Sequence, residues 1–198
     1  TANEKWSTQS ELAKRASVTA LGGDLITRMG RCEIIPEMEY RVDITALNPA
    51  DYDALLVLEN YEAFLFVHQF QLPDIGHVLA IYRGHDISAR AVMMLLNRVG
   101  NTPVIGFTDP DPAGLAIVND NQFFTHAIIP AIDSLAGAAS LAIRFRKQLA
   151  ARPHLKAQCS QRSGAFQRYA NWIIDTGFAT SQEWLCSQSV PLRLIEMD

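Results

Sequence analysis

Three carboxylates occupy positions that are typical of a metal site. Asp109 and Asp111 follow the apolar start of the stretch IGFTDPDPAG, and Glu59 follows the apolar run ALLVL. Carboxylate oxygens are preferred ligands of Mg²⁺, which keeps several waters and takes few ligands from the protein. If the three groups met without a cation, they would repel one another and raise at least one pKa. The residue types therefore predict a divalent-cation site formed by Glu59, Asp109 and Asp111, with Mg²⁺ as the cofactor and Mn²⁺ as its substitute.

The residues around the two aspartates indicate how their loop continues. Proline is favoured at the first position of a helix, so Pro112 predicts a helix start with Asp111 as its N-cap. Pro110 stiffens the link between the two acids, and Gly114 leaves room for a ligand to approach the backbone. An aspartate that caps a helix before proline is also common where there is no function. An aspartate nucleophile of the phosphatase type is a further interpretation of the pattern.

Four short apolar runs are expected to be the strands that position these side chains. They cover residues 54–60, 77–84, 102–109 and 125–130. Helical patterns lie between the runs, and strands that alternate with helices predict a parallel sheet. Ligands of such sheets bind at the carboxyl ends of the strands, where Glu59 ends the first run and Asp109 the third. The second run ends in Arg83, Gly84 and His85, which we expect beside a bound phosphate.

The predicted fold class is α/β, with a Rossmann-like parallel sheet of about four strands flanked by helices and a helical C-terminal part. Residues 1–50 are expected to be a lead-in segment that belongs to a larger upstream region. Within it, residues 1–20 are predicted to be helical, and residues 31–49 to be an edge strand or extended chain. Residues 51–198 are expected to form the α/β domain, with a helical extension that begins near residue 134.

The charge distribution predicts one surface for a polyanion. The net charge of -4 is not that of a typical nucleic-acid-binding domain. However, no acidic residue lies between Asp133 and Asp175, while this interval holds seven of the 17 basic residues. They are Arg144, Arg146, Lys147, Arg152, Lys156, Arg162 and Arg168. This basic stretch fits either a surface that binds a phosphate backbone or a solvated helix face.

Cysteine usage and hydropathy indicate where the protein works. The three cysteines, Cys32, Cys159 and Cys186, lie far apart and lack the spacing of a zinc site or a disulfide framework. No apolar run approaches the roughly 20 residues that span a bilayer, and the N-terminal residues lack a signal-peptide pattern. We therefore expect a cytoplasmic protein without a membrane partner.

Three segments, LLVLENYEAF, IYRG and GFTDPDPAG, resemble in this order the motifs of the Toprim domain. The likeness is greatest to the Toprim domains of the topoisomerase VI A subunit and of the nuclease subunit of the Wadjet plasmid-defence system. Glu59 and Phe64 match the glutamate and phenylalanine of the first motif. Asp109, Asp111 and Gly114 match an acidic motif close to D-x-D-x-x-G. The resemblance covers residues 51–130 and implies a Toprim-like fold.

The second Toprim motif is matched less well. In the family a glycine, a proline and an arginine often follow one another, whereas here Gly84 is followed by His85 and Asp86. Arg90 falls near the expected arginine, but the proline is missing. The topoisomerase-type relatives also attack DNA with a tyrosine on a winged-helix domain ahead of the Toprim domain. Because no such domain is evident in the first 50 residues, this mechanism is not assigned to the chain alone.

The resemblance implies a magnesium-dependent protein that cleaves DNA phosphodiester bonds as a nuclease or in the manner of a topoisomerase. Glu59 would be a metal ligand or the acid–base partner of the leaving 3' oxygen, and Asp109 and Asp111 would hold the metal. The residues expected to contact DNA are Arg83, Gly84, His85, Arg90, Gly114, Arg144, Arg146 and Lys147. Further expected partners are an upstream winged-helix domain, partner subunits or a second copy in a homodimer.

Two other functions remain open from the sequence. The first is a non-catalytic DNA-binding or interaction module of a larger defence or repair assembly. The second is a phosphohydrolase that acts on a small molecule, for which the basic stretch would be dispensable. Cleavage that depends on Glu59 would distinguish the nuclease from the module.

Overall fold

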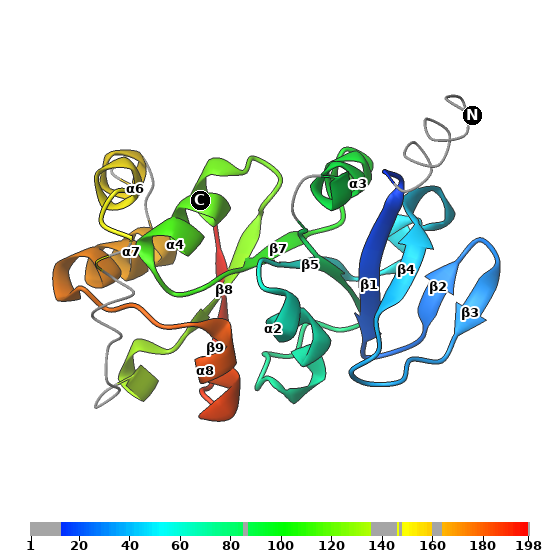
Figure 1. Ribbon diagram of the computed structural model, residues 1–198, viewed down its shortest axis with the longest axis horizontal. Helices are drawn as coiled ribbons and strands as arrows, with labels where there is room; N and C mark the ends of the chain where they lie inside the picture. The colour runs from blue at the N-terminus through cyan, green and yellow to red at the C-terminus, as the bar shows by residue number, and fades with distance from the viewer. Residues whose placement is uncertain (1–12, 85–86, 136–145, 147, 160–163, 198) are drawn as a thin grey trace, which may run out of the picture. The chain divides into compact units, whose positions relative to one another are not determined.

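The computed structural model describes residues 13–84, 87–135, 146, 148–159 and 164–197, and it has an α/β architecture (Figure 1). The chain folds as two compact units. The first consists of Thr1–His68 and Ile75–Pro103, and the second of Gln69–Asp74 and Val104–Asp198. Each unit combines strands of a mixed sheet with helices that flank them, and each is described in turn.

The first unit contains four strands of the main sheet in the order β4-β1-β6-β5. Their bounds are Arg15–Leu21 for β1, Tyr40–Asp43 for β4, Ala54–Leu58 for β5 and Val78–Tyr82 for β6. Strand β1 runs antiparallel to both β4 and β6, whereas β5 and β6 are parallel. All five residues of β5 are buried, as a short unbroken apolar run predicts. The strands predicted at residues 54–60 and 77–84 are thus confirmed as β5 and β6.

Helices and a separate hairpin complete the first unit. Helix α2 (Tyr61–Leu65) contacts β5 and β6, and α3 (Ile87–Leu96) packs on β1. Strands β2 (Leu25–Thr27) and β3 (Gly30–Cys32) form a two-stranded antiparallel hairpin. Three 3₁₀ turns are described as well: η1 (Ile44–Ala46), η2 (Pro49–Asp51) and η3 (Val67–Gln69).

The prediction of a helix across residues 1–20 is wrong for its last part, because residues 15–21 form β1. Residues 1–12 lie outside the described residues. Five consecutive residues of this strand are buried, including the polar side chains of Ser17 and Thr19. Partners on both sides, β4 and β6, satisfy the β1 backbone, so pairing outweighs the local pattern. The edge strand expected within residues 31–49 is confirmed as β4.

The second unit contains β7 (Val104–Phe107), β8 (His126–Pro130) and β9 (Leu192–Glu196). Strands β7 and β8 are parallel, and β9 runs antiparallel to β8. The described residues thus contribute four strands of the main sheet from the first unit and three from the second, and their directions are mixed. The predicted parallel sheet of about four strands is corrected accordingly. The added strands β1, β4 and β9 are all antiparallel to a neighbour.

The C-terminal part predicted to be helical from about residue 134 does contain helices, but the prediction is wrong for residues 192–196, which form the strand β9. Helix α4 (Pro112–Asp120) follows β7, and α6 (Arg152–Cys159), α7 (Gly164–Thr176) and α8 (Gln182–Ser187) follow the turn η4 (Ile132–Leu135). Helices α4, α6 and α7 contact one another (Figure 1), and α7 also contacts β9. No helix among the described residues combines the length and the apolar character needed to cross a membrane.

Candidate functional site

The loop from β7 to α4 has the shape predicted for the DPDPAG stretch. Asp111 is the N-cap of α4: its Oδ1 accepts a hydrogen bond from the Gly114 amide at 2.9 Å. The Asp111 amide donates to the Asp109 carbonyl at 2.8 Å, which turns the chain tightly between the two acids. Asp109 and Asp111 are 7% and 1% exposed. Buried carboxylates cost free energy unless they are bonded or neutralised, and the Gly114 amide provides such a bond for Asp111.

A distant segment of the second unit holds the Asp109 side chain. The amide of Gln182, the first residue of α8, donates to Asp109 Oδ1 at 2.8 Å. The Gln182 side chain is fully buried, and its Nε2 donates to the Phe107 carbonyl at 3.3 Å. Next to it, the Thr180 amide donates to the Pro110 carbonyl at 3.4 Å. Residues 180–182 therefore fix the loop from outside its own sequence neighbourhood.

Gly114 is explained by packing within the loop. A Cβ at this position would lie 2.2 Å from the Asp109 carbonyl oxygen, far closer than such atoms approach in proteins. The first turn of α4 can therefore contact the backbone of Asp109 only if residue 114 has no side chain. The sequence analysis predicted that Gly114 leaves room for a ligand, whereas in the structure it leaves room for the Asp109 backbone.

The hydroxyl groups of Tyr169 and Thr180 are buried in the second unit, and the sequence did not single out either residue for this site. The side chains of Tyr169 and Thr180 are each 1% exposed. Among the described residues, no hydrogen-bond partner reaches the Tyr169 hydroxyl or Thr180 Oγ1. Burial raises the pKa of the Tyr169 phenol, and the negative charge of Asp111 raises it further. The phenol therefore remains a proton donor, and Asp111 lies within its electrostatic reach.

The described residues contain no cluster of three or more His, Cys, Asp or Glu side chains that could hold a metal ion. Within the second unit, Asp109 and Asp111 each use Oδ1 for a bond from a backbone amide, which fixes the orientation of the carboxylate. Mg²⁺ is commonly bound through one or two carboxylates together with waters and substrate phosphates. The chemistry of this donor pair therefore fits a hard divalent cation.

Glu59 belongs to the first unit and follows β5 directly, as predicted. Its side chain is half-buried, and its Oε2 atom is fully buried. The next residue, Asn60, caps α2 by accepting bonds from the amides of Glu62 and Ala63 at 2.8 and 3.3 Å. Glu59 is thus held between a buried strand and a capped helix, whereas Glu62 is an exposed residue of that helix.

The residues predicted to contact phosphate at the end of the second strand lie in the first unit as well. The Arg83 amide donates to the Leu58 carbonyl at 2.8 Å, so the parallel ladder places Glu59 and Arg83 at neighbouring strand ends. Gly84 is buried and has a φ of 70°, a backbone conformation that favours glycine. His85 lies outside the described residues. Arg90 is an exposed residue of α3.

The basic stretch is described only in part. Arg144, Lys147 and Arg162 lie outside the described residues. Arg146, Lys156 and Arg168 are exposed, and Arg152 is half-buried at the start of α6. The described members of the stretch thus have solvent-accessible side chains in the second unit, as a phosphate-binding surface or a solvated helix face requires.

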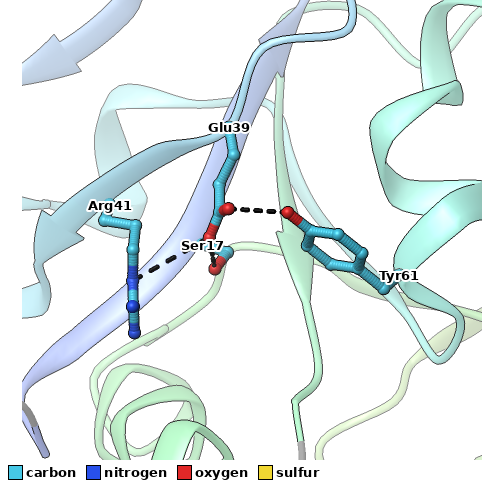
Figure 2. Close-up of polar contacts among 4 residues, drawn as sticks. All are labelled: Ser17, Glu39, Arg41 and Tyr61. Atoms are coloured by element: carbon cyan, nitrogen blue, oxygen red, sulfur yellow. Dashed lines mark hydrogen bonds and ion pairs between the residues drawn. The ribbon is translucent and has the colours of Figure 1, made fainter.

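A polar cluster around Glu39 connects three elements of the first unit (Figure 2). Ser17 of β1 donates a hydrogen bond to Glu39 Oε1, and Tyr61 donates to Glu39 Oε2 at 2.7 Å. Arg41 of β4 forms an ion pair with the same carboxylate at 3.8 Å. Because Tyr61 is the first residue of α2, the cluster anchors the helix start that follows Glu59. The sequence did not indicate this cluster, because Ser17 and Tyr61 each lie 22 positions from Glu39.

We expect the Glu39 cluster to make the stability of the first unit depend on pH. Burial raises the pKa of Glu39, but the bonds from Ser17 and Tyr61 and the charge of Arg41 bring it below the usual 4.5. A lowered folded-state pKa stabilises the fold above the unfolded value, and this stabilisation is lost as the pH falls through the folded value. Urea unfolding should therefore show Glu39→Gln to be less stable than the parent at pH 7.

The difference between these two proteins should shrink as the pH falls below about 4.5. Glu37→Gln is a suitable control, because it removes an exposed glutamate two positions away. A difference between parent and Glu39→Gln that stays constant from pH 7 to 3 would contradict the expected role of the Glu39 charge.

The fold and the acidic loop define an α/β protein with two buried aspartates at the carboxyl end of a parallel strand. The chain belongs to the family described as Domain of unknown function (DUF7281), whose model matches residues 15–194. The match includes β1 and most of β9, so the antiparallel strands are part of the family's domain. No curated protein matches the chain.

Proposed function

We propose that this chain is a magnesium-dependent Toprim-domain protein that acts on DNA phosphodiester bonds. The observation that carries the proposal is the pair of buried aspartates, Asp109 and Asp111, whose carboxylates are oriented by backbone amides at the end of β7. These amide bonds compensate for the burial of the two carboxylates and hold them beyond the carboxyl end of a parallel strand, where ligands of α/β sheets bind. The resemblance of three motifs to the Toprim domain supports the same assignment.

In this function, each group of residues would have a distinct role. Asp109 and Asp111 would hold Mg²⁺, and α8 would keep Asp109 in place through the Gln182 amide. Bound there, Mg²⁺ would supply neutralisation of the charge on the scissile phosphate. For Glu59 of the first unit we propose the role that the resemblance implies, as a metal ligand or as the acid–base partner of the leaving 3' oxygen. Arg83 and the basic stretch would position the DNA backbone without reading its sequence.

A second candidate function is a non-catalytic DNA-binding or interaction module of a larger assembly. It is favoured by the finding that no group of three metal-ligating side chains occurs among the described residues. In this case the two aspartates would only shape the loop, and the basic stretch would make the contact with DNA. The two functions differ in whether divalent cations bind at Asp109.

Calorimetric titration with Mn²⁺ or Mg²⁺ tests the proposal. We expect Asp109→Asn to weaken cation binding at least about tenfold, since asparagine keeps the acceptor for the Gln182 amide but loses the charge. Asp175→Asn is the matched control, because it removes one charge from an exposed position of α7. Equal cation affinity in parent and Asp109→Asn would contradict the proposal, and DNA binding that persists without a cation would then favour the module.

A further inference from the structure

A pocket of about 310 Å³ lies within the second unit, at the carboxyl end of β8. Its floor includes Ile129 and Pro130 of β8, and its walls include Ala165 and Tyr169 of α7 and Ile195 of β9. Because β8 runs parallel to β7, this end of β8 is on the same sheet edge as the loop of Asp109 and Asp111. Ligands of α/β sheets bind at this edge.

Two arginines from different elements line the pocket: Arg168 of α7 and Arg193 of β9. Both border the pocket because β9 pairs with β8, with Arg193 opposite Ile129, and because α7 packs on β9. Both side chains are exposed, and no ion pair of either guanidinium is found among the described residues. Asp133 is the one acidic residue in the lining, so the formal charge of the pocket is positive. Two guanidinium groups at one concave site are typical of phosphate recognition.

The rest of the lining is mainly apolar. Ile129, Pro130, Ile132, Ala165 and Ile195 contribute aliphatic surface beside the arginines. The Tyr169 side chain contributes one wall, and its hydroxyl is buried without a hydrogen-bond partner among the described residues. Small-molecule sites usually combine such apolar walls with a few charged groups that orient the ligand. A simple inorganic anion would leave these walls unused, whereas a nucleoside carrying a phosphate would cover them.

We propose that this pocket binds a nucleoside phosphate, with Arg168 and Arg193 on the phosphate and the aliphatic wall against the sugar or base. The ligand is either a free mononucleotide or one nucleotide unit of a DNA strand, since both present the same chemistry. The site does not depend on a cation at Asp109 and Asp111. It can therefore exist whether or not the chain cleaves DNA.

The test is a binding assay on the full chain in buffer with EDTA, which separates this site from any cation site. The probes are thymidine monophosphate, followed by calorimetry, and a fluorescently labelled single-stranded oligothymidylate, followed by anisotropy. We expect the double variant Arg168→Gln with Arg193→Gln to weaken binding of the recognised probe about tenfold or more, because it loses charged hydrogen bonds to phosphate. Binding of the mononucleotide identifies a free nucleotide as ligand, and binding of the oligonucleotide alone identifies a strand.

Two further variants separate the pocket from general charge attraction. Arg28→Gln with Arg31→Gln removes the same two charges from exposed positions of the first unit and should leave binding unchanged. Ala165→Phe keeps both arginines but fills the apolar part of the pocket, and it should weaken binding as strongly as their loss. Thermal unfolding of each variant shows whether it is folded. Failure of both probes to bind, or equal weakening by the two double variants, would overturn the proposal.

Discussion

Glu59→Gln is expected to lower the rate of DNA cleavage by about 10²–10⁴-fold, the usual contribution of a general acid–base group. Glutamine keeps the size and hydrogen-bonding reach of glutamate but loses the charge that a metal or a transferred proton requires. The half-buried position of Glu59 after β5, beside the strand end of Arg83, provides the setting for this role. We expect the fold and most of the DNA affinity to be retained, because the basic stretch would still contact the backbone.

The measurement is nicking or linearisation of a supercoiled plasmid in Mn²⁺, with EDTA as the blank. Glu62→Gln is the matched control, since Glu62 lies one helical turn later and is exposed. The control should cleave at the rate of the parent. Cleavage by Glu59→Gln at the parent rate would mean that Glu59 only ends a strand, and its proposed role in catalysis would be refuted.

Gly114→Ala is expected to lower the free energy of unfolding of the second unit by about 1–3 kcal/mol, the usual cost of inserting extra atoms into a packed site. In an ordinary helix the same change stabilises by about 1 kcal/mol, because alanine loses less backbone freedom on folding. Here the sign is reversed, since the new Cβ would lie 2.2 Å from the Asp109 carbonyl oxygen. Backbone atoms cannot move aside as a flexible side chain can, so either α4 or the aspartate loop must shift.

Urea unfolding at neutral pH measures this loss. Gly100→Ala is a control for backbone conformation alone: Gly100 has a φ of 57°, but its added Cβ would meet nothing within 4 Å. Its expected cost is about 1–2 kcal/mol, the penalty of the left-handed region. If Gly114→Ala were as stable as the parent, the close approach of α4 to Asp109 would not exist in solution.

Cation binding should also weaken in Gly114→Ala, since Asp109 would be displaced.

Local patterns were sufficient for much of the fold and for the shape of the acidic loop. The buried strands β5, β6, β7 and β8 were predictable because each is a short apolar run between turn residues. Asp111 was predictable as the N-cap of α4, since Pro112 and a capping aspartate act within one turn. The positions of Glu59 and Asp109 at strand ends followed from the same runs.

The remaining features depend on contacts between residues that are far apart in the chain. Strand β1 has a weak local signal and is selected by pairing with β4 and β6, and β9 is selected by pairing with β8. The bond from the Gln182 amide to Asp109 joins residues 73 positions apart. The sequence by itself thus determined which acids stand at strand ends, because helix caps and apolar runs are local. Only the tertiary structure decided which group holds Asp109 and that Arg168 and Arg193 line one pocket. The reason is that strand pairing and helix packing are set by burial across the whole unit.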